Sequence, residues 1–188
     1  MRSAVLAATL AELAEGGYAA LSFDGVAERA GVHKTTLYRR WGTKDNLMLE
    51  ALLEQGRERV PIPDTGSLRD DLIAYGEAIV ASVADPETEA MVRVVVSIGD
   101  PDSPLAEASR RFWSARRELA GVMVERAIAR GEVPPETDPG TVVEALLGAI
   151  YFRLLMSRER LSSGFVRDVA DLISAPAARP KARRRAAS

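Results

Sequence analysis

Glycine and proline divide this 188-residue chain into segments of helical length, and that division constrains the fold more than any other feature. A glycine ends a helix readily because it adopts a left-handed conformation without steric cost, and proline cannot continue one. Between these breaks apolar residues recur at helical spacing, and no hairpin pattern appears. We therefore predict an all-α fold of about nine helices, at Ser3–Glu15, Ser22–Ala30, Lys34–Trp41, Lys44–Arg59, Ser67–Ala84, Glu87–Ile98, Leu105–Arg130, Asp138–Arg158 and Phe165–Ile173.

The sixth of these segments is the ambiguous one. Its run from Met91 to Val96 is β-branched enough for a strand, but no partner strand is visible elsewhere, so we predict a helix. The paired acids Asp70 and Asp71 are expected in the first turn of a helix, where negative charge favours the dipole.

Composition favours a soluble cytoplasmic protein. The chain has no cysteine, so it forms no disulfide and no cysteine-ligated metal centre, which fits a reducing compartment. An apolar run follows Arg2 as in a signal peptide, but Glu12 and Glu15 interrupt it. The apolar stretch Ala145–Phe152 is too short to span a bilayer, so no membrane contact is expected.

The net charge of −2 is unevenly distributed along the chain. Residues 1–60 carry eight basic and eight acidic side chains, residues 61–178 carry twelve and nineteen, and the tail from Arg179 carries five basic and none acidic. An acidic body repels DNA, so any nucleic-acid contact is expected in the N-terminal head or in the tail. The tail could add phosphate contacts or serve only as a solubilising extension.

Residues 22–41, SFDGVAERAGVHKTTLYRRW, have the layout of a helix-turn-helix, with a glycine-containing turn between two short helices. Leu37 and Trp41, four residues apart, mark the buried face of the second helix. The side chains on its outward face combine phosphate-binding donors with groups able to touch base edges, as a helix in the major groove requires. They are Lys34, Thr35, Tyr38 and Arg39.

The ordered pattern Gly31-Val32, Thr36-Leu37-Tyr38, Trp41 and Lys44 resembles the signature of the tetracycline-repressor (TetR) family, over roughly residues 3–55. The resemblance implies a dimeric regulator that places the helix from Lys34 in the major groove of double-stranded DNA and most often represses transcription. The DNA contacts that the resemblance implies are Ser22, Lys34, Thr35, Thr36, Tyr38, Arg39 and Lys44.

His33 departs from the family pattern, in which a small N-capping residue such as serine is usual at this position. An imidazole caps a helix poorly, and we expect His33 to be a surface turn residue, the alternative being an approach to a phosphate. Arg40, beside Trp41, could be nothing more than a solvated charge.

Dimerisation is expected in the body, because two heads about one DNA turn apart, roughly 34 Å, double the base contacts. The eighth helix is apolar nearly all round and the ninth carries one apolar face, so both could pack against a second copy, as the family resemblance also implies. The alternative is an intramolecular core. The expected interface residues are Leu146, Ile150, Leu154, Phe165, Val169 and Leu172.

The same resemblance implies that the fifth to eighth helices enclose a cavity for a small hydrophobic or amphipathic effector. The aromatic and methionine residues that could line it can equally be ordinary core. Tyr and Arg groups would orient the ligand there. The candidate lining residues are Tyr75, Met91, Val95, Phe112, Trp113, Met123 and Tyr151.

The expected domains are a DNA-binding head (1–45), a ligand-binding and dimerisation body (46–175, with 46–60 as connecting helix) and a disordered basic tail (176–188). We expect no enzyme and no cofactor, because the chain has one histidine, no phosphate-binding glycine loop and no metal-ligand pairs at helical spacing. A helical protein-interaction module and a regulator without a small-molecule effector remain as alternatives.

Overall fold

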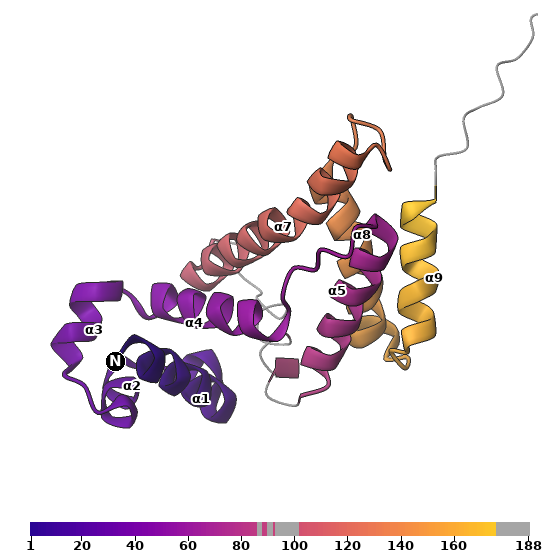
Figure 1. The fold of residues 1–188 in the computed structure, drawn as a ribbon. Helices are drawn as coiled ribbons and strands as arrows, with labels where there is room; N and C mark the ends of the chain where they lie inside the picture. The colour runs from indigo at the N-terminus through magenta and orange to yellow at the C-terminus, as the bar shows by residue number, and fades with distance from the viewer. Residues whose placement is uncertain (86–87, 90–91, 93–101, 176–188) are drawn as a thin grey trace, which may run out of the picture.

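The computed structural model describes residues 1–85, 88–89, 92 and 102–175, and the regular elements in these ranges are all helical (Figure 1). The fold prediction is therefore confirmed. The elements are α1 Arg2–Ala20, α2 Phe23–Ala30, α3 Lys34–Trp41, α4 Lys44–Arg59, α5 Leu68–Val83, α7 Pro104–Arg130, α8 Pro139–Tyr151, the π-helix η1 Phe152–Ser157 and α9 Ser163–Ser174.

Short polar side chains begin most of these helices by accepting a hydrogen bond from a backbone N–H of the first turn, which has no partner inside the helix. The expected caps Ser22, Thr43, Ser67 and Asp138 all do so. His33 precedes α3 without a side-chain capping bond, as expected for an imidazole. Local sequence signals thus determine where the helices begin.

Two helix ends differ from the sequence prediction. Helix α1 continues past the expected stop at Gly16-Gly17 to Ala20, with Gly17 in a non-helical conformation (φ 67°, ψ −174°). The glycine breaks the helix for one residue without ending it. The eighth helix does not stay α-helical to Arg158 but changes at Phe152 to a π-helical turn. The sixth predicted helix and the basic tail fall largely or wholly outside the described residues.

The head and the body have separate hydrophobic cores. Helices α1 to α4 enclose the first, around Leu6, Val26 and Leu37, and the body helices enclose the second, around Leu72, Met123 and Ile150. In Figure 1 the N-terminal helices α1, α2 and α3 form one end of the molecule, and α5, α8 and α9 lie side by side at the other.

Helix α4 belongs to both parts. Its N-terminal half contributes Leu47, Met48 and Ala51 to the head core, so this core extends beyond residue 45. Val60, directly after the helix, lies in the body core. A displacement of α4 relative to α7 would therefore move the head.

The stretch from α8 through η1 leaves apolar surface exposed. Residues Pro139–Ser157 have a mean hydropathy of 1.4 and are, by length and composition alone, apolar enough to cross a membrane. A helix covered by a protein partner has the same composition. Within the described body the exposed large apolar side chains are Phe152, Met156 and Leu172.

Candidate functional site

Helices α2 and α3 meet at a fixed angle because a small apolar core lies between them. Leu37 and Trp41 on α3 are buried, as the four-residue spacing predicts. Phe23 at the start of α2 packs edge-on against the ring of Tyr38, with 4.5 Å between the ring centroids. The Tyr38 side chain therefore has a packed base while half of its surface stays exposed.

The outward face of α3 presents a basic and hydroxylated surface. Thr35, Tyr38 and Arg39 are exposed, while Lys34 and Thr36 are half-buried. The Lys34 ammonium forms a 2.6 Å ion pair with Asp24 of α2, which raises the pKa of Lys34 through this hydrogen bond. A phosphate would have to compete with Asp24 for Lys34, whereas no such pair holds Arg39 within the described part of the chain.

Besides Lys34, two more of the seven expected DNA-contact residues, Ser22 and Lys44, already have intramolecular hydrogen-bond partners. The Ser22 hydroxyl accepts the backbone N–H of Gly25 and so caps α2. The Lys44 ammonium donates to the carbonyl oxygens of Tyr18 and Leu21 and lies 4.2 Å from the Tyr18 ring centroid. Lys44 thus closes the end of α1 against α4, with one of its three N–H donors not used in these bonds.

Tyr18 completes this junction. Its hydroxyl donates to the carboxylate of Asp45, and burial, followed by that hydrogen bond, raises the pKa of Tyr18 to about 12. Sequence reasoning missed the contact because Tyr18 lies beyond the glycine pair where α1 was expected to stop.

The first half of α4 is bonded to the head on two sides. The two carboxylate oxygens of Glu50 accept bonds from Arg2 of α1 and from the indole N–H of Trp41 at the end of α3, each at 2.6 Å. A second carboxylate on α4, Glu54, also accepts from Arg2. The recognition helix α3 and α4 are therefore connected directly through Glu50.

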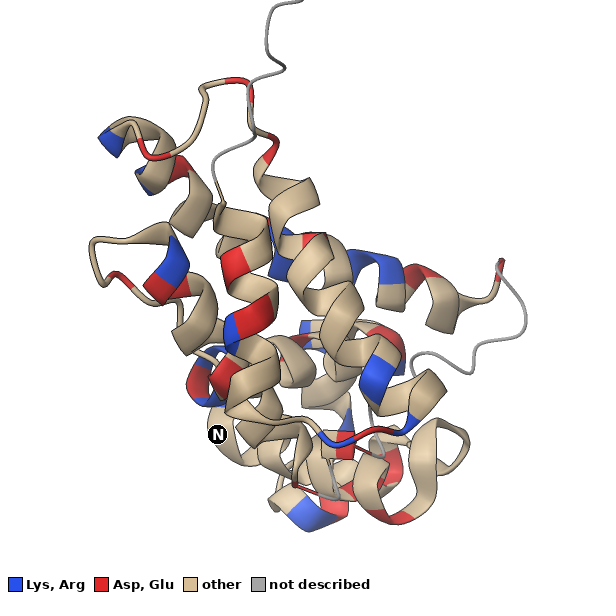
Figure 2. Cartoon of the chain, turned by 90° about the vertical axis from the view of Figure 1, so that its right-hand side faces the viewer, with Lys and Arg blue, Asp and Glu red and all other residues tan. Residues whose placement is uncertain are grey.

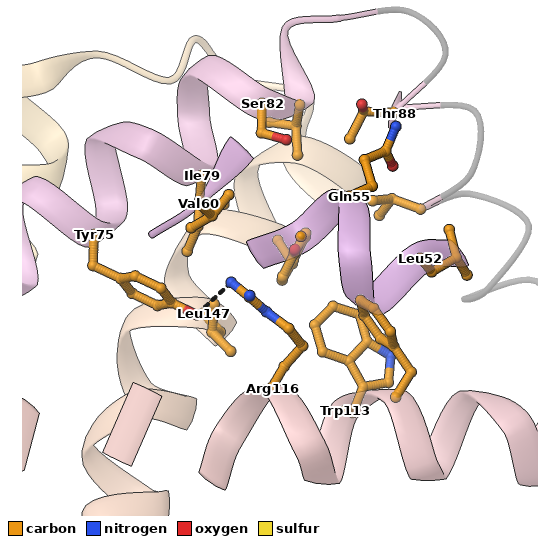
Figure 3. A pocket seen from close by; sticks show the side chains of 15 residues that line it. Leu52, Gln55, Val60, Tyr75, Ile79, Ser82, Thr88, Trp113, Arg116 and Leu147 are labelled. Atoms are coloured by element: carbon orange, nitrogen blue, oxygen red, sulfur yellow. Dashed lines mark hydrogen bonds between the residues drawn. The ribbon is translucent and has the colours of Figure 1, made fainter. Parts of the chain in front are cut away.

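The second half of α4 borders a cavity of about 80 Å³ in the body (Figure 3). Aliphatic and aromatic side chains from α4, α5, α7 and α8 form most of its wall. Phe112, Trp113 and Tyr151 stack edge to face along one side, with centroids 5.1 and 5.3 Å apart. The described lining residues are Leu52, Gln55, Gly56, Val60, Tyr75, Ile79, Ser82, Val83, Thr88, Val92, Phe112, Trp113, Arg116, Leu147 and Tyr151.

Four of the predicted ligand-binding residues, Tyr75, Phe112, Trp113 and Tyr151, line this cavity. Met123 does not: it is fully buried in the body core and is absent from the described lining. Helical spacing alone does not distinguish a lining residue from a core residue. Met91 and Val95 lie outside the described residues.

Arg116 is the functional feature of the cavity that sequence reasoning missed. It lies in a run of charges on α7 that resembles a solvated face, yet only 6% of its surface is exposed. Its guanidinium donates a 3.0 Å hydrogen bond to the Tyr75 hydroxyl. Burial raises the pKa of Tyr75, and the charge of Arg116 opposes that rise. Among the described lining residues it is the only one with a formal charge.

The structure corrects two of the six expected interface residues. Leu146 and Ile150 are fully buried within the chain, where α8 packs against α5, α7 and α9, so neither faces a second copy. Leu172 is 78% exposed, and Leu154, Phe165 and Val169 are half-buried. Periodicity showed α8 to be apolar nearly all round but did not indicate which face the neighbouring helices cover.

Comparison with known families accounts for both parts of the chain. The profile of bacterial regulatory proteins of the tetR family matches residues 5–51, and that of the tetracyclin repressor-like C-terminal domain matches residues 62–173. The chain belongs to the TetR family. It is therefore a helix-turn-helix transcriptional regulator, as the pattern in residues 22–44 predicted.

Individual TetR-family relatives agree with this assignment. The regulator AqdR of Rhodococcus erythropolis is 40% identical over 151 residues, 80% of this chain and 72% of that protein. The repressor TetR of Mycobacteroides abscessus is 30% identical over 184 residues, covering 96% and 95%. The crystal structure of the TetR-family regulator SCO0332 superposes with a TM-score of 0.76 at 34% identity, covering 92% of this chain and 96% of that one.

Proposed function

We propose that the protein is a cytoplasmic, dimeric repressor without enzymatic activity, which leaves a palindromic operator when a small amphipathic effector enters the body cavity. The observation that best supports this proposal is that α3 presents an exposed basic face and is bonded through Glu50 to the first half of α4. The second half of α4 borders the cavity. Repression of transcription, rather than activation, is supported by the relative from Mycobacteroides abscessus, which is named a repressor.

On the DNA side, Thr35, Tyr38 and Arg39 are the exposed side chains proposed to approach base edges or phosphates, with Lys34 and Thr36 at the margin. Lys44 and Ser22 contribute by holding the ends of α1 and α2 in place, besides any phosphate contact. In this proposal the head through residue 45 binds DNA, residues 46–60 connect, and the rest of the body to residue 175 binds the effector and dimerises.

The dimer interface is proposed on η1 and α9, with Leu154, Phe165, Val169 and Leu172 as its expected residues and Phe152 and Met156 added by their exposure. Figure 2 looks onto the side where α9 lies and shows charges of both signs scattered among uncharged residues. The exposed apolar side chains of η1 and α9 suit a contact between proteins, whereas a DNA-binding face would be dominated by basic residues.

Transmission follows from the position of α4. An effector touching Leu52, Gln55 and Gly56 would displace the second half of the helix, and the bonds of Glu50 would carry the displacement to α3. The distance between the two recognition helices would change and operator affinity would fall, because the effector favours one of two body conformations.

The DNA interface is tested by selecting binding sites from a random duplex pool and titrating the selected site against variants at two salt concentrations. We expect a palindromic site. Tyr38→Phe keeps the ring against Phe23 and removes only the hydroxyl, whereas Arg39→Gln removes an exposed charge. Arg39→Gln should weaken binding by about tenfold and reduce the salt dependence, because a charged contact to DNA is lost.

The matched control is Arg117→Gln on α7, an exposed charge of the same kind that lies outside the head, the described cavity lining and the proposed dimer interface. It should leave operator affinity unchanged. Failure to enrich any motif, together with equal effects of Arg39→Gln and Arg117→Gln, would contradict the proposed DNA interface.

A further inference from the structure

Arg116 is a buried cation without an acidic partner among the described residues. Its side chain rises from α7 and points across the cavity toward Tyr75, as Figure 3 shows. The other arginines of the second half of α7 that form ion pairs, Arg117, Arg126 and Arg130, each reach a carboxylate at the surface. A buried charge is costly unless it is paired, so a guanidinium without an acidic partner among the described residues favours an anionic ligand in this cavity.

The donor arrangement around Arg116 suits a carboxylate. The guanidinium has five N–H donors in a planar fork, and its hydrogen bond to Tyr75 uses one of them. The Tyr75 oxygen accepts that bond, so its own O–H proton is available as a second donor. Both groups line the cavity together, and no described lining residue carries a negative charge that would repel an anion.

The rest of the cavity suits an apolar body attached to that carboxylate. The edge-to-face row of Phe112, Trp113 and Tyr151 offers a flat wall, and Ile79 and Leu147 are among the aliphatic lining residues. Besides Arg116 and the two tyrosines, the polar side chains of the described lining are Gln55, Ser82 and Thr88. A ligand with one charged end and one apolar end therefore matches both parts of the lining.

We propose that the effector is an amphipathic monocarboxylate whose carboxylate pairs with Arg116 and Tyr75. This inference rests on the proposed function, since it specifies the ligand of the same cavity. It also places the charged end of the ligand against α4: a Cβ added at Gly56 would lie 3.3 Å from an Arg116 nitrogen, so the guanidinium packs directly on the connecting helix.

The test is isothermal titration of the full-length protein, without DNA, using benzoate and octanoate, each compared with its uncharged primary amide. At least one acid should bind wild type about tenfold or more tightly than its amide, because charge-assisted bidentate bonds are stronger than neutral ones. Arg116→Met should reduce acid affinity by about tenfold or more and leave amide affinity unchanged, so that the acid preference disappears.

Arg117→Met is the matched control, because it removes the same charge from the next residue of α7, where the guanidinium is about half exposed and paired with Glu144. It should keep the acid preference of wild type. Arg116→Lys, which retains the charge but not the planar fork, should bind the acid with intermediate affinity, and it replaces Arg116→Met if the latter does not fold.

Absence of binding by both acids, equal affinity for acid and amide in wild type, or equal losses in the two methionine variants would overturn the inference. Because this titration contains no DNA, its outcome does not depend on whether the protein is a DNA-binding regulator. An operator found by selection combined with no acid preference would reject only the carboxylate. A clear acid preference without any operator would instead reject the proposed DNA function.

Discussion

Asp71 is a fully buried carboxylate on α5 that holds the loop before the helix. One of its oxygens accepts the backbone N–H of Thr65 at 2.6 Å and the Thr65 hydroxyl at 2.8 Å. The only cation near its other oxygen in the described chain is Arg130, at 4.0 Å. Asp71→Ala should therefore lower the free energy of unfolding by about 2–4 kcal/mol, because two charge-assisted hydrogen bonds from Thr65 are lost.

Asp70→Ala is the control for this residue, since Asp70 stands in the same first turn of α5 but is exposed. Its cost should stay below about 1 kcal/mol, the scale of a surface charge near a helix N-terminus. Denaturant unfolding of both variants gives the comparison, and equal losses would show that the Thr65 bonds contribute nothing.

At the residue scale, sequence indicated side-chain chemistry better than side-chain surroundings. Asp70 and Asp71 were correctly expected in a first turn, but their spacing could not show that one of them is buried. Arg116 was missed for the same reason, because burial depends on helices far apart in the chain. The outward face of α3 was predictable, because a two-turn helix with Leu37 and Trp41 inside has only one other side.

Among the helices, α4 has one carboxylate, Glu50, that accepts hydrogen bonds from both α1 and α3. Glu50→Ala removes the bonds to Arg2 and to Trp41, so the thermal midpoint should fall by several degrees. Operator affinity should fall as well, since α3 is then positioned less firmly. Glu50→Gln should have an intermediate effect, because its amide oxygen can still accept the indole N–H.

Glu58→Ala, at an exposed position nearer the end of α4, should change neither the midpoint nor operator affinity. Thermal unfolding and operator titration of the three variants provide the measurement. A loss of stability in Glu50→Ala with unchanged operator affinity would show that the link between α4 and α3 does not carry the position of the recognition helix.

At the element scale, helix starts were predictable and two helix ends were not. A capping side chain acts within a few residues, so Ser22, Thr43 and Asp138 could be located from sequence. The continuation of α1 past Gly17 and the π-helical turn after Tyr151 depend on the surrounding packing. These ends involve Tyr18, which the prediction left outside the first helix, and Phe152, which it placed inside a continuous α-helix.

At the scale of the whole molecule, the family signature was enough to predict the architecture. Which residues of α8 face inward could be learned only from the structure. Leu146 and Ile150 face inward, and exposed apolar side chains occur instead on η1 and α9. If the operator is two-fold, as proposed, such side chains favour a second copy as the cover, because pairing removes apolar area from water and sets the spacing of two heads.

Leu172→Glu tests that arrangement, since Leu172 is 78% exposed in the single chain. Folding of the monomer should be unaffected, but a carboxylate buried in an interface should weaken dimerisation by about tenfold or more. Ala7→Glu, on an exposed position of α1, introduces the same charge in the head and should leave the dimer intact. Sedimentation equilibrium measures both variants. A stable Leu172→Glu dimer would show that the interface lies elsewhere. A monomeric wild type that still binds a full palindrome tightly would show that DNA binding needs no such interface.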